Sequence, residues 1–159
     1  MALTAKRVVQ ELARLNRKSY FIEWDEARRT VLCWLQTGAC EDDDDVRFAC
    51  YANKRWRVSV LLGEEYPFRS PSVGFVDSIY HPNVDEQSGT ICLNALNDDW
   101  TPMYDICAIL EQLLPQLLRY PNPDDPLNAE AARLYLDSPK TFAETVNARY
   151  DGAANAAVG

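Results

Sequence analysis

The chain has 159 residues, 47% of them hydrophobic, so it can form one domain with a full-sized core and is not expected to be disordered. Its net charge of -8 excludes general nucleic-acid binding, because neutralising phosphates requires a basic face. No apolar run approaches the roughly 20 residues that cross a bilayer, and the first residues lack the apolar block of a signal peptide, so we expect a soluble, intracellular protein without membrane contact.

The five cysteines are scattered, with no CxxC pair, and their number is odd. We therefore expect reduced thiols rather than a disulfide framework. A structural zinc site needs several cysteine or histidine ligands at short spacing, which this chain with its single histidine does not supply, so we predict no metal. Taken singly, each cysteine is more often a small buried hydrophobic residue than a nucleophile.

The first predicted element is an amphipathic helix at residues 4–17, where hydrophobic residues recur every three to four positions. The opposite side carries Lys6, Arg14 and Arg17. A solvated helix face is the simpler interpretation of this basic stripe. A docking surface for an acidic protein partner is the alternative.

Residues 19–76 are predicted to form an antiparallel meander of short strands. In RWRVSVLLG, residues 55–63, hydrophobic and polar residues alternate as in a sheet with one face in water. The acidic run at 41–45 is interpreted as a loop between two strands. About 40 residues follow in which spaced prolines predict rigid, irregular backbone of the kind that often carries functional sites.

The C-terminal part is predicted to contain three helices, at residues 104–119, 128–136 and 139–150. Pro115 falls inside the first helix and should kink or interrupt it. Asn128 suits the N-cap of the second helix. Ser138 and Pro139 suit the N-cap and the first position of the third.

The stretch YHPNVDEQSGTIC, residues 80–92, contains the only histidine of the chain. A Cys-His hydrolase would need His81 as the base for the Cys92 thiol. Pro82 restricts the histidine backbone, so a structural role in the turn is favoured for the ring. Cys92 follows a sharp turn around Gly89, and a polar, partly exposed turn is the environment that a reactive cysteine needs.

Five motifs resemble those of the ubiquitin-conjugating (E2) enzymes in order and spacing: YPFRSP at 66–71, HPN at 81–83, GTICLN at 89–94, WTP at 100–102 and YPNPDDPLN at 120–128. The resemblance implies an α+β UBC fold with an N-terminal helix, a four-stranded antiparallel meander sheet, an irregular active-site segment and C-terminal helices. Residues 1–150 would then be one catalytic-core domain, and 151–159 a short flexible tail.

The chain looks most like the H-type branch of these enzymes, in PSVGFVDSIYHPNVDEQSGTICLN, LLPQLLRYPNPDDPLN and AARLYLDSP. An extra residue between Asn83 and Cys92 agrees with that branch, as does the insertion of Pro115 and Gln116. Two features depart from the family pattern. Asn53 and Lys54 replace a pair of glycines, so the turn there should be rebuilt, and an aspartate common two residues after the cysteine is an asparagine here.

The resemblance also implies roles for site residues. Cys92 would carry ubiquitin as a thioester. Asn83 would either stabilise the oxyanion formed when lysine attacks or order the catalytic loop. Asp125 and Tyr80 would line the approach of the lysine, which must lose its proton. The alternatives are a turn element for Asp125 and packing for Tyr80.

Two docking surfaces follow from the same resemblance. The positions at which these enzymes meet the RING or HECT domain of a ligase are matched by Pro67, Phe68 and Pro102. The surface that meets the activating enzyme is matched by Lys6, Arg7 and Arg14. Structural roles are expected for His81, Pro82 and Trp100.

The leading interpretation is an enzyme that accepts ubiquitin from an activating enzyme and passes it to lysines of protein substrates with a RING-type ligase, which the H-type likeness suggests is multi-subunit. The activating enzyme spends the ATP, so no cofactor is expected. The alternatives are another ubiquitin-like modifier, a non-catalytic ubiquitin-binding module and, least favoured, a hydrolase. The expected location is the cytoplasm, with the nucleus second.

Overall fold

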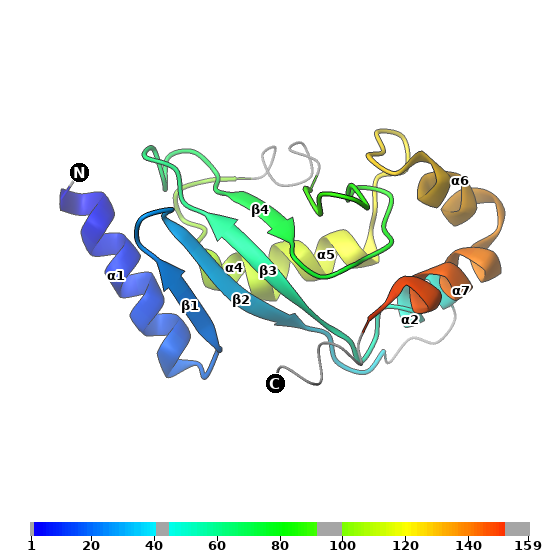
Figure 1. Ribbon diagram of the computed structural model, residues 1–159, viewed down its shortest axis with the longest axis horizontal. Coiled ribbons are helices and arrows are strands. Elements are labelled where there is room, and N and C mark those ends of the chain that lie inside the picture. The colour runs from blue at the N-terminus through cyan, green and yellow to red at the C-terminus, as the bar shows by residue number, and fades with distance from the viewer. Residues whose placement is uncertain (1, 41–44, 92–99, 152–159) are drawn as a thin grey trace.

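The computed structural model describes residues 2–40, 45–91 and 100–151. Its centre is a four-stranded antiparallel sheet in which each strand pairs with the next along the chain, as predicted. The strands are β1 (Ile22–Asp25), β2 (Thr30–Gln36), β3 (Arg55–Leu61) and β4 (Ser72–Phe75). Figure 1 shows them crossing the middle of the molecule.

The register of β2 and β3 explains which face of the sheet is buried. Their hydrophobic residues pair directly across the two strands, Val31 with Val60, Cys33 with Val58 and Leu35 with Trp56. All six side chains are buried. Successive residues of a strand point to opposite faces, so the residues between them lie on the other face. The alternation predicted for residues 55–63 is therefore confirmed.

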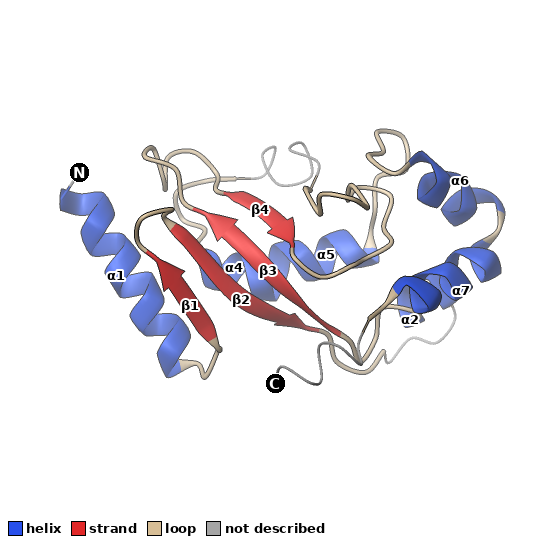
Figure 2. Ribbon diagram, in the orientation of Figure 1, coloured by secondary structure: helices blue, strands red, loops and turns tan. Residues whose placement is uncertain are grey.

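Helices cover the sheet on one face and at both ends (Figure 2). Helix α1 (Ala2–Arg17) lies beside β1, and α4 (Ile106–Ala108), η1 (Ile109–Leu113) and α5 (Leu114–Arg119) run behind the strands. The opposite end holds α2 (Val46–Ala49), α6 (Ala129–Asp137) and α7 (Pro139–Arg149). No helix in the described part of the chain is long and apolar enough to cross a membrane.

The helix predicted at 104–119 begins two residues later and changes type near Pro115. Asp105 is its N-cap and accepts a hydrogen bond from the Ala108 N–H. The five residues of η1 form a π-helical turn just before Pro115. A proline lacks the N–H and clashes with the carbonyl four residues earlier, and a wider turn moves that carbonyl away. The predicted interruption is therefore a π turn.

The turn before β3 is rebuilt around Asn53, as its sequence predicts. Asn53 has a φ of 55°, whereas Lys54 is not among the residues with positive φ. The Asn53 N–H donates to the Gly38 carbonyl, and the Thr37 hydroxyl accepts from the Lys54 N–H. A single left-handed residue therefore replaces the glycine pair.

The remaining predictions for helices are largely met. Asn128 caps α6 by accepting from the Ala131 N–H. Ser138 is the N-cap residue of α7, but its side chain makes no capping hydrogen bond. Helix α2, which the sequence analysis did not predict, begins after Asp45, whose side chain accepts from the Arg47 N–H. Most of the acidic run and of the predicted tail lies outside the described residues.

The turn around Gly89 generates a stability prediction. Gly89 has a φ of 76°, and a Cβ added there would overlap the carbonyl of Phe75, whose N–H donates to the Gly89 carbonyl at 2.8 Å. We expect Gly89→Ala to lower the free energy of unfolding by about 2–4 kcal/mol in urea titrations. The matched control is Gly63→Ala, because no atom lies within 4 Å of its added Cβ. Equal losses in the two variants would contradict the prediction.

Candidate active site

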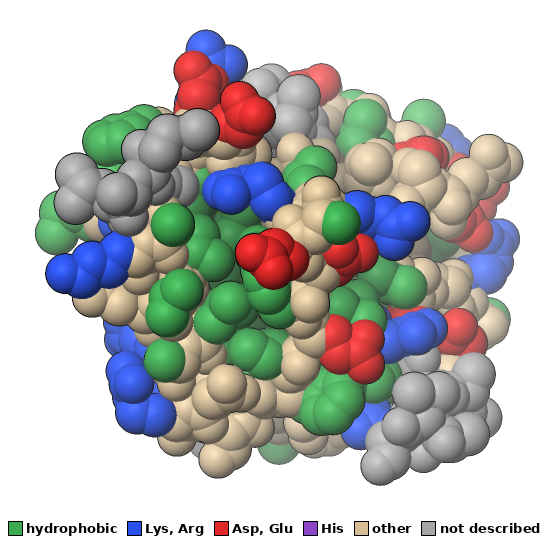
Figure 3. Space-filling model, turned by 60° about the vertical axis from the view of Figure 1, so that its left-hand side comes forward, with side chains coloured by type: hydrophobic (Ala, Val, Ile, Leu, Met, Phe, Trp, Pro, Cys, Tyr) green, Lys and Arg blue, Asp and Glu red, His purple; other side chains and the backbone are tan. Residues whose placement is uncertain are grey.

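His81 is a buried part of the framework around the candidate site. Its Nδ1 accepts a hydrogen bond from the Asn83 N–H at 3.0 Å, so its Nε2 carries the proton and donates to the Leu117 carbonyl at 2.9 Å. Burial lowers the pKa of the ring to about 4. Figure 3 accordingly shows no histidine on the face it draws. Both nitrogens are used, which favours the structural role over a catalytic base.

Asn83 binds the loop formed by residues 120–128. Its side-chain nitrogen donates to the carbonyls of Asn122 at 2.7 Å and Asp125 at 3.4 Å, and its side-chain oxygen accepts from the Asn122 N–H at 2.8 Å. The Pro82 carbonyl accepts two more bonds, from the N–H groups of residues 127 and 128. The HPN motif therefore anchors this loop through both its backbone and its amide side chain.

The chain leading to position 92 is anchored on its other side. Ile91 is buried and forms an antiparallel bridge with Val84, directly after the HPN motif. Thr90 forms a second bridge with Gly74 in β4. Cys92 itself lies outside the described residues, as does Asn94, so their roles stay predictions. The residue next to Cys92 is nevertheless held between the sheet and the HPN motif.

Other cysteines in the described part of the chain are poorly suited to act as nucleophiles. Burial raises the pKa of Cys33 to about 12 and that of Cys50 to about 12. It also raises the pKa of Cys107. A reactive cysteine has to form a thiolate, which burial in apolar surroundings opposes. These three cysteines therefore behave as small hydrophobic residues.

Tyr80 and Asp125 have different environments. Tyr80 is 1% exposed, packs against Phe142, and donates from its hydroxyl to Glu130 at 2.7 Å. These contacts favour the packing alternative for Tyr80. Asp125 is exposed in the 120–128 loop that Asn83 binds. A role of Asp125 near the lysine stays a prediction.

The last helix contributes a residue that the sequence analysis missed. Arg149 of α7 forms an ion pair with Glu86 and lies over the ring of Tyr80, 5.4 Å from its centroid. The Glu86 carboxylate also accepts a longer bond from the Asn128 side chain at 3.4 Å. Arg149 thus connects the C-terminal helix to the segment that precedes Cys92. No local sequence pattern indicates a pairing of residues so far apart.

The predicted ligase-docking residues lie on two adjacent loops. Phe68 is 76% exposed and Pro102 is also exposed, whereas Pro67 is buried. Pro67 therefore supports the surface instead of projecting from it. Trp100 is half-buried, and its indole N–H donates to the Pro67 carbonyl at 2.9 Å. Met103, 94% exposed, is an apolar residue next to Pro102 that the sequence analysis missed.

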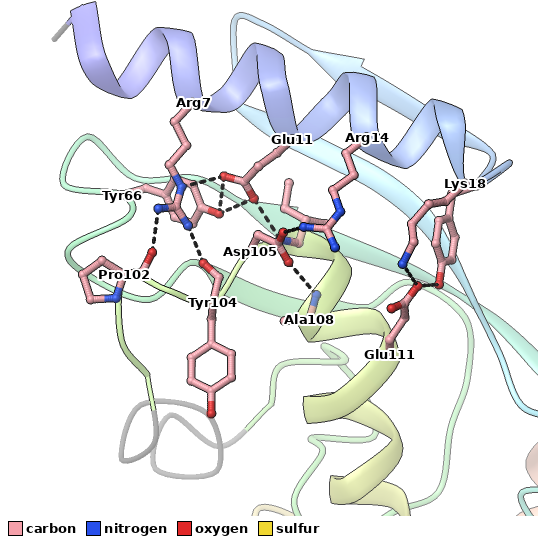
Figure 4. Close-up of polar contacts among 12 residues, drawn as sticks. Arg7, Glu11, Arg14, Lys18, Tyr66, Pro102, Tyr104, Asp105, Ala108 and Glu111 are labelled. Carbon is pink, nitrogen blue, oxygen red and sulfur yellow. Dashed lines mark hydrogen bonds and ion pairs between the residues drawn. The ribbon is translucent and has the colours of Figure 1, made fainter.

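The basic residues of α1 are not one continuous solvated stripe. Arg7 donates to the Pro102 carbonyl, and Arg14 forms an ion pair with Asp105 at 2.8 Å (Figure 4). Lys18, directly after α1, pairs in the same way with Glu111 at 2.7 Å. Of the three residues predicted to meet the activating enzyme, Lys6 is exposed, and Arg7 and Arg14 hold the chain that follows Trp100. The sequence analysis did not foresee these internal partners.

Comparisons with known proteins give consistent matches. A family model described as ubiquitin-conjugating enzyme matches residues 45–150. Ubiquitin-conjugating enzyme E2 5 of Arabidopsis thaliana is 51% identical over 96 residues, which are 60% of this chain and 52% of that protein. The NEDD8-conjugating enzyme UBC12 of Eremothecium gossypii is 41% identical over 102 residues, 64% of this chain and 54% of that protein. The chain thus spans about half the length of these relatives.

A solved structure supports the fold independently of close sequence similarity. The E2 domain of a Toxoplasma gondii ubiquitin conjugating enzyme superposes with a TM-score of 0.73 at 22% identity. The match covers 92% of this chain and 96% of that chain. The two proteins therefore share the α+β UBC fold.

The environment of His81 predicts an unusual titration. A folded-state pKa near 4, below the ordinary 6.5, means that stability from the neutral ring is complete above pH 6.5 and is lost as the pH falls towards 4. Between pH 7 and 5 we expect wild type to lose on the order of 2 kcal/mol more unfolding free energy than His81→Gln. The variant loses the titrating ring but shares the carboxylates, so it is the control for general acid effects.

The same prediction has a direct spectroscopic measurement. His81 is the only histidine, so ¹⁵N-histidine labelling gives a single imidazole without assignment. We expect the neutral tautomer with the proton on Nε2 to persist below pH 5 in the folded protein. A midpoint near 6.5 would show that the ring is accessible and would contradict the buried arrangement.

Proposed function

The chain belongs to the ubiquitin-conjugating enzyme family, and on this premise we propose that it accepts ubiquitin as a thioester on Cys92 and transfers it to lysine. The observation that carries the proposal is the hydrogen-bonded HPN motif. It binds the 120–128 loop on one side and pairs through Val84 with Ile91 on the other. The relatives named above are ubiquitin or NEDD8 transferases and support the same chemistry.

The proposed reaction consists of two acyl transfers. The Cys92 thiolate attacks the thioester carbonyl of ubiquitin on the activating enzyme, and the activating enzyme's thiolate leaves. A neutral lysine amine of the substrate then attacks the new thioester, loses a proton and expels the Cys92 thiolate. No redox step or bound metal is required. Any group that helps must therefore position the lysine, accept its proton or stabilise the oxyanion.

The contacts of Asn83 favour loop ordering over direct oxyanion stabilisation. Its amide nitrogen already donates to the Asn122 carbonyl at 2.7 Å, and its oxygen accepts from the Asn122 N–H. Its second N–H donates to the Asp125 carbonyl at 3.4 Å, so Asn83 could donate to an oxyanion only by releasing one of these two bonds to the loop. Loop ordering requires no such change, and the bond to the Asp125 carbonyl keeps that residue next to the HPN motif.

The modifier is the point on which the relatives differ. Ubiquitin is favoured, because the Arabidopsis relative named for ubiquitin is 51% identical and the relative named for NEDD8 is 41% identical. A NEDD8-like modifier is the second candidate on the strength of the latter match. We propose a RING-type ligase as the partner that meets Phe68 and Pro102, since rigid apolar residues on adjacent loops suit a weak, exchangeable interface.

Thioester formation is the first expected outcome. Purified protein mixed with ubiquitin-activating enzyme, ubiquitin and ATP should give a band one ubiquitin heavier on a non-reducing gel, and thiol should remove it. Cys92→Ala should abolish the band, whereas Cys40→Ala, which replaces a half-buried cysteine, should retain it. A band only with NEDD8 and its own activating enzyme would favour the second candidate. No band with either, from folded protein, would favour a binding module.

Asn83→Ala should separate the two roles of the asparagine. We expect normal charging and a roughly hundredfold slower discharge onto free lysine, because misplacing a loop near reacting groups has effects of that order. If Asn83 orders the loop, amide hydrogen exchange at Leu127 and Asn128, whose N–H groups donate to the Pro82 carbonyl, should accelerate in the same variant. Slow discharge with unchanged exchange at these two amides would instead indicate oxyanion stabilisation. The control is Asn147→Ala, which removes an exposed asparagine from α7.

A further inference from the structure

Glu11 is a charged residue that α1 turns into the protein. Its side chain accepts hydrogen bonds from the Tyr66 hydroxyl at 2.6 and 2.8 Å, the Ile106 N–H at 2.9 Å and Arg7 Nε at 3.0 Å. The residue is 6% exposed. A buried carboxylate is stable only when it is paired and hydrogen-bonded, and Glu11 has a partner of each kind. It therefore joins three separate segments at one point.

Two of these partners lead directly to the predicted docking loops (Figure 4). Tyr66 begins the segment 66–68, which carries the first docking residues. Arg7, held by its ion pair with Glu11, donates to the carbonyls of Pro102, at 2.6 Å, and Tyr104. The carboxylate thus fixes one loop through a hydroxyl and the other through a guanidinium.

The two loops are also bound to each other. The Trp100 indole N–H donates to the Pro67 carbonyl, and the rings of Trp100 and Tyr66 lie 6.0 Å apart. Phe68 and Pro102 are therefore exposed on a single hydrogen-bonded unit. The buried Glu11 side chain holds this unit through Tyr66 and Arg7.

We propose that Glu11 is a positioning residue for ligase docking, which fixes from within the fold the two loops that present Phe68 and Pro102. The inference deepens the proposed function and rests on it, because the docking residues were assigned by resemblance. Glu11 is too buried to contact a partner, so its effect on binding passes through the loops. Loops that are already ordered lose less entropy when they dock, which strengthens a small interface.

Four variants test this positioning role separately from a general loss of stability. Glu11→Gln keeps the size and one acceptor oxygen but loses the charge that holds Arg7. Tyr66→Phe removes only the hydroxyl that reaches Glu11, so it keeps the ring packing. Lys18→Gln is the matched control, because Lys18 directly follows the same helix and its ion pair with Glu111 makes no bond to either docking loop. Phe68→Ala is the reference for loss of the docking surface itself.

The first measurement is discharge of the ubiquitin thioester onto lysine, titrated with the RING domain of a ligase that accelerates wild type. Glu11→Gln and Tyr66→Phe should need about tenfold more RING domain for half-maximal stimulation, the effect of ordering one or two further side chains on binding. The rate at saturating RING domain, the charging rate and the unstimulated discharge should stay within about twofold of wild type. A purely structural defect would lower all of these rates together and would overturn the proposal.

The second measurement does not depend on activity. The indole N–H signal of Trp100, identified by its absence in Trp100→Phe, reports the bond between the two loops. Its exchange with solvent should be at least about tenfold faster in Glu11→Gln than in wild type and unchanged in Lys18→Gln. Unchanged exchange in Glu11→Gln would overturn the proposal. If wild type forms no thioester, the proposed function fails, while the indole exchange still decides whether Glu11 positions the loops.

Discussion

Irregular backbone inside a protein has to satisfy its N–H and C=O groups without a helix or a sheet, and buried polar side chains do this here. Four such side chains lie in the described part of the chain: Glu11, Asp77, His81 and Asn83. Each accepts a bond from, or donates one to, a backbone group in another segment or turn. The irregular segments around the site are fixed because these four bonds hold them to regular elements.

Three of these residues, Asp77, His81 and Asn83, follow one another along the chain as it approaches the site. Asp77 ends the pairing of β3 and β4 by accepting from both the backbone and the guanidinium of Arg57. His81 then fixes the chain to α5, and Asn83 fixes the 120–128 loop to the chain. With these bonds in place, the backbone leaves the sheet after β4, passes α5 and returns to β4 at Thr90. The proposed nucleophile follows two residues later.

The sheet and the Asn128 helix cap were predictable because each depends on neighbours in sequence, whereas the HPN motif was found by resemblance to a family. Hydrophobic alternation revealed β3, and Asn128 signalled the start of α6. The destination of Arg7 was not predictable, since the carbonyl that it binds lies 95 residues away. The burial of Tyr80 and of Pro67 depends on the same kind of distant packing. A family resemblance supplies the position of a motif but not which of its side chains the fold encloses.

The pairing of α1 divides its positive charge into two groups with different consequences. Arg7 and Arg14, with Lys18 directly after the helix, pair with acidic residues of the domain and contribute mainly to holding α1 against the chain after Trp100. Lys6 and Arg17 are exposed, as Arg14 and Lys18 are, but the structure describes no ion pair for either Lys6 or Arg17 among the residues it covers. At a distance, the positive potential beside α1 therefore comes chiefly from Lys6 and Arg17, since charge already neutralised nearby contributes little. The paired residues thus hold the packing of α1, and Lys6 and Arg17 supply most of the charge of this surface.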